Sequence, residues 1–259
     1  MQRPDVRELF KYCPKIDRAL EMLKAKQVWC SKSVHFNDPF DGNIPFEVDD
    51  SPGAFVSAAV TQYAKDGHKW DGIKEILDDS ILPDCTLSAK KRADIDTTAK
   101  EFLDSNRNMG ILSLSEQPLS ILMWSHYGAN HTGVCIGFER NSTNDLGDDD
   151  ACSPVCYSDF YPKPRFSQLF AADGTLTHDL FYIKAREWAY EKEWRLMTEK
   201  GNATVKCPGE ISRVILSCRA DAKTEADFLN ECRNQKIPLY RAMQVPGAFM
   251  LELRPLFTP

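Results

Sequence analysis

The sequence predicts an α+β protein with a mixed or antiparallel sheet core and an inserted helical lobe. Short apolar runs typical of strands precede, surround and follow the helical stretches, without the regular strand and helix alternation of a doubly wound sheet. The stretch from about 54 to 106 has helical spacing instead, which indicates an insertion. The composition, 42% hydrophobic and 27% charged, is ordinary for a protein with a buried core.

The N-terminal segment predicts a strand, a helix and a second strand. LFKYC at 9–13 is a short apolar run, Pro14 suits the start of a helix, and QVWCSKS from residue 27 restarts an extended segment. HFNDPFDG at 35–42 is a loop rich in turn-forming residues. The helix shows the i, i+3, i+4, i+7 spacing of a buried face at Ile16, Ala19, Leu20 and Leu23.

The rest of the chain supplies further strands and helices, and one face of the inserted lobe carries Ile95, Ala99, Phe102 and Leu103. The predicted strands are 109–116, 132–139, 153–159, 187–198, 211–217, 239–245 and 249–255. The predicted helices are 119–127, which Gln117 and Pro118 introduce and Gly128 stops, about 165–186, and about 222–234.

Length and composition predict a single domain over 1–259, with the helical insertion at about 54–106. No apolar run reaches the roughly 18 residues that cross a membrane, and the opening MQRPDVRELFKY lacks the apolar centre of a signal peptide. We therefore expect a cytoplasmic protein without a membrane partner. Nine cysteines in a long chain without an export signal predict reduced thiols, and their spacing completes no metal-ligand pattern, so no metal is predicted.

Three stretches combine polar groups with aromatics: FNDPFDG at 36–42, SLSE with MWSHYGANHTG at 113–116 and 123–133, and YEKEWR at 190–195. Each has a structural alternative. Asn37 and Asp38 are turn formers, and Ser115 stands where a helix cap is expected. His126 and His131 are more often structural than catalytic. The net charge of −6 argues against whole-surface attraction to nucleic acid, but a local basic groove stays open.

EWAYEKEWRLMT at 187–198 separates apolar from charged side chains most clearly. As a strand it places Trp188, Tyr190, Trp194 and Leu196 on one face and Glu191, Glu193 and Arg195 on the other. The two carboxylates would lie about 7 Å apart on that face, with Arg195 able to pair with either. A solvated ladder of alternating charge is the alternative, but two flanking tryptophans favour a strand that is anchored in the core.

FNDPFDG, SLSE with MWSHYGANHTGVCIGF, and KAREWAYEKEWR together resemble the bacterial domain-of-unknown-function 2971 family. More distantly, the early strand with a tyrosine, the strand with a serine and the late E-x-E are similar to ADP-ribosyltransferases, including the branch of DNA-modifying toxins. That resemblance implies an ADP-ribosyltransferase-like sheet core. It also implies that Glu193 is the catalytic carboxylate and that Glu191 serves the acceptor. The first strand has neither the arginine nor the histidine usual in that superfamily.

The same resemblance implies NAD as a substrate. The residues expected to bind it are Lys11, Tyr12, Asn37, Asp38, Ser115, His126, Tyr127 and Arg195. The expected function is ADP-ribosylation of a macromolecule, nucleic acid or protein, in phage defence or as a bacterial toxin. One alternative is a nuclease or other hydrolase with a divalent metal held by Asp38, Asp41, Glu191 and Glu193. Another is a non-catalytic module that binds a ligand or a partner.

Two expectations can be compared with a structure directly. Asn37, Ser115, His126, Glu191 and Glu193 are expected to line one pocket. Trp188 and Trp194 are expected to be mostly buried.

Overall fold

The computed structural model describes residues 3–42, 52–67, 69–84, 86–163, 165, 168 and 175–259. The chain divides into two compact units. The first consists of Met1–Lys32, Gly110–Tyr157 and Arg186–Pro259, and the second of Ser33–Met109 and Ser158–Ala185.

The first unit contains most of the strands. They are β1 (Glu8–Cys13), β2 (Gln27–Cys30), β3 (Gly110–Ser115), β4 (Val134–Glu139), β5 (Cys152–Pro154), β8 (Glu193–Thr198), β9 (Ala203–Lys206), β10 (Ile211–Leu216), β11 (Leu239–Gln244) and β12 (Leu251–Phe257). β6 (Cys156–Ser158) lies where the chain passes into the second unit. The helices of the first unit are α1 (Ile16–Ala25), α5 (Ile121–His126), the 3-10 helix η3 (Arg186–Glu191) and α7 (Ala222–Gln235).

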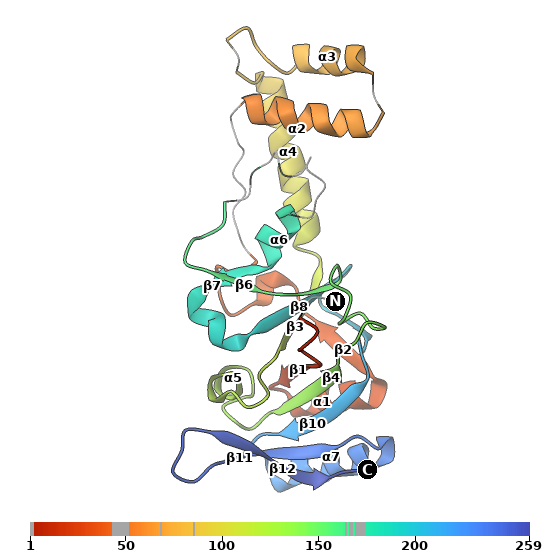
Figure 1. Ribbon diagram of the computed structural model, residues 1–259, viewed down its shortest axis with the longest axis vertical. Helices are drawn as coiled ribbons and strands as arrows, with labels where there is room; N and C mark the ends of the chain where they lie inside the picture. The colour runs from red at the N-terminus through yellow and green to blue at the C-terminus, as the bar shows by residue number, and fades with distance from the viewer. Residues whose placement is uncertain are drawn as a thin grey trace. The chain divides into compact units, whose positions relative to one another are not determined.

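Eight of these strands form one sheet in the order β12-β11-β10-β4-β1-β3-β8-β5 (Figure 1). β10 and β11 are parallel, whereas the other neighbouring pairs are antiparallel. β2 and β9 pair separately. The sequence prediction of an α+β fold with a mixed sheet is therefore confirmed at that level.

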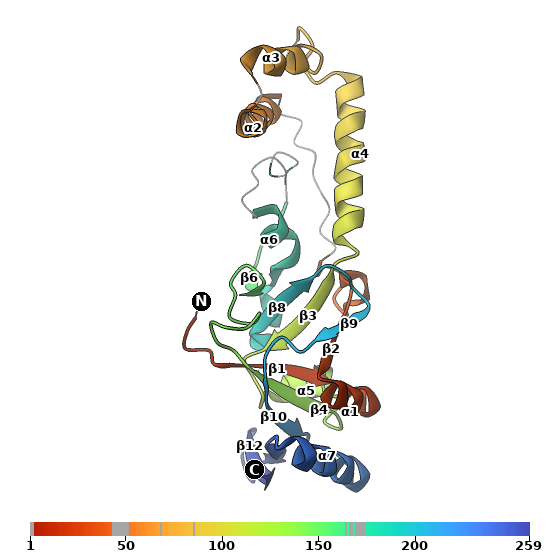
Figure 2. The ribbon, with the colours of Figure 1, turned by 90° about the vertical axis from the view of Figure 1, so that its right-hand side faces the viewer.

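α1 and α7 cover one face of the sheet, and α5 covers the other (Figures 1 and 2). The face under α1 and α7 holds the larger core, which includes Leu9, Phe138, Trp194, Val214 and Phe228. The α5 face holds a smaller, largely aromatic cluster that includes Phe10, Tyr12, Met123, Trp124 and Ile215. Alternation along β1 explains the split, because Leu9 and Phe10 point to opposite faces.

Local sequence fixes the ends of the helices that cover the sheet. The Asp221 carboxylate caps α7 by accepting a 2.7 Å hydrogen bond from the backbone N–H of Thr224. α1 ends at Lys26 and α7 at Lys236, both in the left-handed conformation that closes a helix. α5 ends before Gly128, where an added Cβ would lie 2.6 Å from the Trp124 ring. Glycine thus lets the chain turn tightly under α5.

The second unit is mainly helical. It contains the 3-10 helix η1 (Ser33–His35), α2 (Pro52–Lys65), α3 (Trp70–Asp78), α4 (Ala89–Asn106), α6 (Thr175–Phe181) and β7 (Ile183–Ala185). Asp41 and Lys184 are both buried there, with Oδ2 and Nζ 3.5 Å apart. Ile95 and Ala99 of α4 are buried, as the helical spacing predicts.

Two sequence predictions of secondary structure need correction. The strand expected over 187–198 begins only at Glu193, because 186–191 form η3 and Lys192 adopts a left-handed φ of 42°. The helix expected over about 165–186 is present only as α6, and the chain is extended again in β7. Much of that predicted helix, at 166–167 and 169–174, lies outside the described residues.

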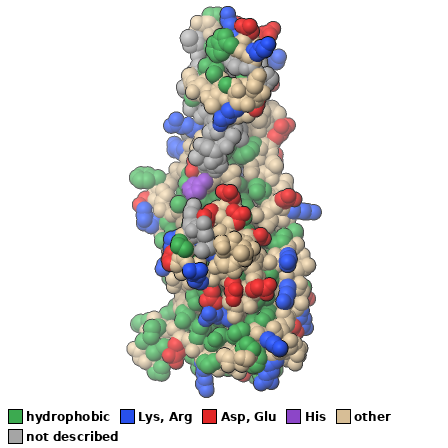
Figure 3. Space-filling model, turned by 45° about the vertical axis from the view of Figure 1, so that its right-hand side comes forward, with side chains coloured by type: hydrophobic (Ala, Val, Ile, Leu, Met, Phe, Trp, Pro, Cys, Tyr) green, Lys and Arg blue, Asp and Glu red, His purple; other side chains and the backbone are tan. Residues whose placement is uncertain are grey.

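The β11–β12 end of the first unit presents apolar side chains to solvent (Figure 3). Phe249 and Met250, in the turn between the two strands, are both exposed. No residue predicted from the sequence to form the site lies in this turn.

Candidate functional site

A polar cluster lies on the α5 face of the sheet, where β3 and β8 pair. Ser115 stands directly opposite Glu193, and Ser113 opposite Arg195. Glu193 and Arg195 share this face because they are two residues apart on one strand. The Arg195 guanidinium donates to both oxygens of Glu193, Nε to Oε1 and Nη2 to Oε2, each at 2.9 Å.

This ion pair is buried. Glu193 is 5% exposed and Arg195 is fully covered. Two buried charges are costly to remove from water, and only good geometry offsets that cost. The bidentate arrangement provides such geometry and fixes the orientation of the Glu193 carboxylate. The backbone N–H of Glu193 also donates to the Tyr157 hydroxyl at 2.8 Å, a contact that sequence reasoning missed.

Glu191 reaches the same region from η3 and not from the strand. Its Oε1 accepts a 2.6 Å hydrogen bond from the hydroxyl of Tyr127, the residue that ends α5. Its carbonyl oxygen accepts a 2.5 Å hydrogen bond from the buried Ser115 hydroxyl. Ser115 Oγ in turn accepts from the backbone N–H of Gln117 at 2.9 Å. Ser115 therefore joins β3 to η3 and positions Glu191.

Three aromatic rings form a triangle, and two of them, Trp188 and Tyr190, belong to the same 3-10 helix as Glu191. The ring centres of His126 and Tyr190 are 6.1 Å apart, those of Trp188 and Tyr190 also 6.1 Å, and those of His126 and Trp188 6.3 Å. His126 is exposed, and Trp188 and Tyr190 are half-buried. The cluster thus combines a buried carboxylate with aromatic rings that solvent reaches.

Trp194 anchors β8 from the opposite face of the sheet. Its ring is fully buried, its Nε1–H donates to Glu116 Oε1 at 2.9 Å, and the Arg140 guanidinium lies 4.3 Å from its ring centre. Burial of Trp194 was predicted and is confirmed. Trp188, which was also expected to be mostly buried, is only half-buried because it belongs to η3 and not to the strand.

Two further predicted residues of the first unit, Lys11 and Tyr12, are neighbours on β1 and point to opposite faces of the sheet. Tyr12 is buried, donates its hydroxyl proton to the carbonyl of Gln117, and meets Trp124 edge to face at 5.0 Å. Burial raises the pKa of the Tyr12 hydroxyl. Lys11 precedes Tyr12 on the same strand, so its side chain points to the opposite face, which α1 and α7 cover. Its Nζ donates to the carbonyl of Ser113 at 3.2 Å.

Asn37 and Asp38 belong to the second unit, whereas Ser115, Tyr127, Glu191, Glu193 and Arg195 belong to the first. Asp38 is buried in a turn, where its Oδ1 accepts a 2.9 Å hydrogen bond from the backbone N–H of Phe40. Its carbonyl oxygen accepts from the N–H of Asp41 at 3.2 Å. These contacts are the ones expected of a turn, which is the structural alternative that the sequence offered for this stretch. The predicted common pocket that includes Asn37 stays a prediction.

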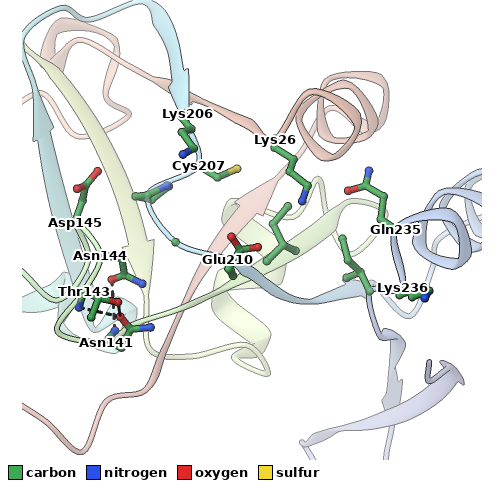
Figure 4. Close-up of a pocket in the computed structure, with 14 residues that line it drawn as sticks. Lys26, Asn141, Thr143, Asn144, Asp145, Lys206, Cys207, Glu210, Gln235 and Lys236 are labelled. Carbon is green, nitrogen blue, oxygen red and sulfur yellow. Dashed lines mark hydrogen bonds between the residues drawn. The ribbon is translucent and has the colours of Figure 1, made fainter.

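A hollow of about 570 Å³ lies elsewhere in the first unit (Figure 4). It is lined by Lys26, Asn141, Thr143, Asn144, Asp145, Lys206, Cys207, Pro208, Gly209, Glu210, Ile211, Gln235, Lys236 and Ile237. Its lysines come from the ends of α1, β9 and α7, and carboxylates of Asp145 and Glu210 share the wall. None of the predicted site residues lines it.

Among the residues that the structure describes, no group of three or more His, Cys, Asp and Glu side chains is placed to hold a metal ion. The helices of the same ranges include none that is both long and apolar enough to cross a membrane.

Residues 123–196 match the model of a family described as a protein of unknown function, DUF2971. The matched region runs from α5 to β8 and contains Tyr127, Glu191, Glu193 and Arg195. The match supports the resemblance to this family that the sequence motifs indicated. No curated protein and no solved structure matches the chain.

Proposed function

We propose that the chain is an ADP-ribosyltransferase-like enzyme that uses NAD to modify a macromolecule, and that its α5 face binds the nicotinamide end. The observation that carries this proposal is the buried Glu191 carboxylate, which accepts a hydrogen bond from Tyr127, on the 3-10 helix that supplies two rings of the triangle of His126, Trp188 and Tyr190. The nicotinamide ring of NAD is planar and carries a positive charge. Aromatic faces and a nearby carboxylate are the groups that attract such a ring.

The reaction would break the bond between the nicotinamide nitrogen and C1 of the ribose. The bonding electron pair leaves with neutral nicotinamide, and positive charge develops on the ribose. An acceptor nucleophile then forms a bond to the ribose carbon and releases its proton to a base or to water. A fixed carboxylate next to the developing charge lowers the barrier, as in glycoside cleavage.

Two carboxylates are available for this work, and their surroundings differ. Arg195 holds Glu193 by both oxygens, so Glu193 is a fixed negative group that cannot swing toward an acceptor. Glu191 Oε1 accepts a hydrogen bond from the Tyr127 hydroxyl, and Glu191 reaches the site from η3 and not from the strand. This difference supports the division in which Glu193 stabilises charge on the ribose and Glu191 serves the acceptor.

The test measures NAD binding and turnover by the full chain. Thermal unfolding is followed with and without NAD, because a ligand at about 100 times its Kd stabilises the native state by about 2.7 kcal/mol. Nicotinamide release is followed with and without cell extract as a source of acceptor. We expect a raised Tm, and nicotinamide release that Glu191→Gln and Glu193→Gln each reduce by roughly 100-fold.

Glu187→Gln is the matched control, because Glu187 is an exposed carboxylate on the same 3-10 helix as Glu191. This variant should release nicotinamide at the wild-type rate. A wild-type protein that neither binds NAD nor releases nicotinamide would overturn the proposal. Activity of Glu193→Gln equal to wild type, in folded protein, would remove Glu193 from the mechanism.

A second candidate is a non-catalytic module that binds a planar cationic group on the same face. The observation that favours it is the burial of the Glu193 and Arg195 pair. A buried, bidentate ion pair of this kind also fits a purely structural role. The two candidates differ in the assay. Binding of NAD or of nicotinamide mononucleotide without any release of nicotinamide favours the module.

A further inference from the structure

A cysteine, a histidine and a serine form a chain of contacts at the end of α5, apart from the residues used above. Cys218 Sγ lies 3.9 Å from His131 Nδ1. His131 Nε2 lies 3.0 Å from Ser125 Oγ. Cys218 follows β10, whereas His131 follows α5, so separate segments bring the thiol and the imidazole together.

The direction of the hydrogen bonds follows from Ser125. Its hydroxyl has one proton, which it donates to the carbonyl of Ile121 at 2.9 Å. With its proton on the Ile121 carbonyl, Ser125 Oγ accepts the hydrogen bond from His131 Nε2–H. A neutral imidazole carries one N–H, so the lone pair of His131 Nδ1 faces Cys218. The imidazole is thus set in the tautomer that can take a proton from the thiol.

The backbone holds His131 in this position. His131 has a left-handed φ of 67°, its N–H donates to the carbonyl of Trp124 at 3.1 Å, and its carbonyl accepts from the N–H of Arg219 at 3.0 Å. Burial, and after it the positive charge of Arg219, lowers the pKa of His131. The imidazole is therefore neutral near pH 7 and available as a base.

We infer that Cys218 is a nucleophilic thiol, with His131 as its base and Ser125 as the residue that orients His131, and that it is a site of covalent modification by small electrophiles. A nucleophile next to a base that a third group orients is the usual arrangement of an activated cysteine. Cys218 is partly exposed, so a small reagent can reach it.

The chemistry is a substitution at the sulfur. His131 Nδ1 takes the thiol proton, and the thiolate attacks the electrophilic carbon. With iodoacetamide as the probe, an S–C bond forms, the C–I bond breaks, and iodide leaves with the bonding electrons. The imidazolium then returns its proton to solvent. The step needs no oxidant or metal.

Other cysteines of the chain supply internal comparisons. Cys207 is partly exposed, like Cys218, but burial raises the pKa of its thiol to about 11. Cys156 is exposed and so is at least as accessible as Cys218. The remaining described thiols are buried, at Cys13, Cys30, Cys135, Cys152 and Cys232. Cys85 lies outside the described residues and is replaced by serine in every protein of the test.

The experiment measures the alkylation rate of each cysteine by iodoacetamide at pH 7, with mass spectrometry of the peptides. We expect Cys218 to react roughly 100-fold faster than Cys156, the lower end of the roughly 100-fold to 10,000-fold that a positioned base contributes. Cys207 should react more slowly than both. A Cys218 rate equal to or below that of Cys156 would overturn the inference.

Two variants test the roles of the neighbours. His131→Asn removes the base but keeps a residue that tolerates left-handed φ, and should bring the Cys218 rate to that of Cys156 or below. Ser125→Ala should lower the Cys218 rate by a smaller factor, because the imidazole loses its orienting partner. Unchanged rates at Cys156 and Cys207 show that each variant is folded. A Cys218 rate unchanged by both variants would contradict the assigned roles.

Discussion

The Tyr127 hydroxyl donates a 2.6 Å hydrogen bond to Glu191 Oε1 across a sequence separation of 64 residues. This contact ties the end of α5 to η3 and holds a buried carboxylate beside rings that are open to solvent. A hydroxyl that donates to a carboxylate favours the charged form of that carboxylate. The position of α5 therefore determines how the Glu191 carboxylate is held, and the proposed chemistry depends on the negative charge of that carboxylate.

Replacement of Tyr127 by phenylalanine should affect turnover more than stability. The variant removes one hydroxyl, whose hydrogen bond to a carboxylate contributes about 1.5–3 kcal/mol at most, and keeps the aromatic ring. We expect the folded state to persist and nicotinamide release to fall by roughly 10-fold, because Glu191 loses its orienting donor. Tyr240→Phe is the control, because β10, β4 and β1 separate its strand β11 from β3 in the sheet. Equal rates for Tyr127→Phe and wild type would show that this contact is only structural.

Trp194→Ala should cost about 3–5 kcal/mol in the free energy of unfolding, because it removes a fully buried ring from the larger core. The change also leaves Glu116 without the indole donor and Arg140 without the ring it covers. Trp188→Ala is the comparison, and it should cost less since Trp188 is half-buried. Denaturant unfolding measures both. A midpoint that Trp194→Ala leaves unmoved would contradict the packing described for β8.

The contrast between Trp194 and Trp188 shows which side-chain orientations the sequence pattern could predict. Alternation predicted the faces of Trp194 and Arg195 correctly, because both lie in a regular strand with one face in the core. The same pattern failed for Trp188 and Tyr190. They lie in a 3-10 helix, and the left-handed Lys192 resets the direction of the chain before β8 begins. Lysine gives no local signal for such a turn, unlike glycine.

The sequence identified residues of the site but not the hydrogen bonds that they make. Glu191, Glu193, Ser115 and Tyr127 were all named from motifs, and the structure brings them together. Their partners depend on tertiary packing, which no spacing encodes. The cysteine contact of His131 is a further example, because Cys218 stands in an unremarkable stretch after β10 and only the fold places it there.

Glu193→Gln should destabilise the fold as well as reduce turnover. The variant leaves the fully buried Arg195 guanidinium without its bidentate carboxylate, a loss that costs about 3–5 kcal/mol. The double variant Glu193→Gln with Arg195→Met removes both charges and should cost less than the sum of the single changes. Urea unfolding of the four proteins gives the coupling. Strict additivity would contradict the buried pair.

The last prediction concerns pH. The pKa of His131 is lowered in the folded state, chiefly by burial, so the unfolded chain binds a proton at a pH where the folded chain does not. Above the unfolded pKa of His131, about 6.5, neither state binds the proton and the folded state is not penalised. As pH falls from about 6.5 toward the folded pKa, the unfolded state gains the proton first, so the free energy of unfolding decreases. We expect the free energy of unfolding to decline between about pH 7 and pH 5 in wild type. His131→Asn should show a smaller decline, because asparagine tolerates the left-handed backbone and does not titrate. Urea unfolding at several pH values measures both slopes, and equal slopes for the two proteins would show that His131 does not bind its proton less tightly in the folded state.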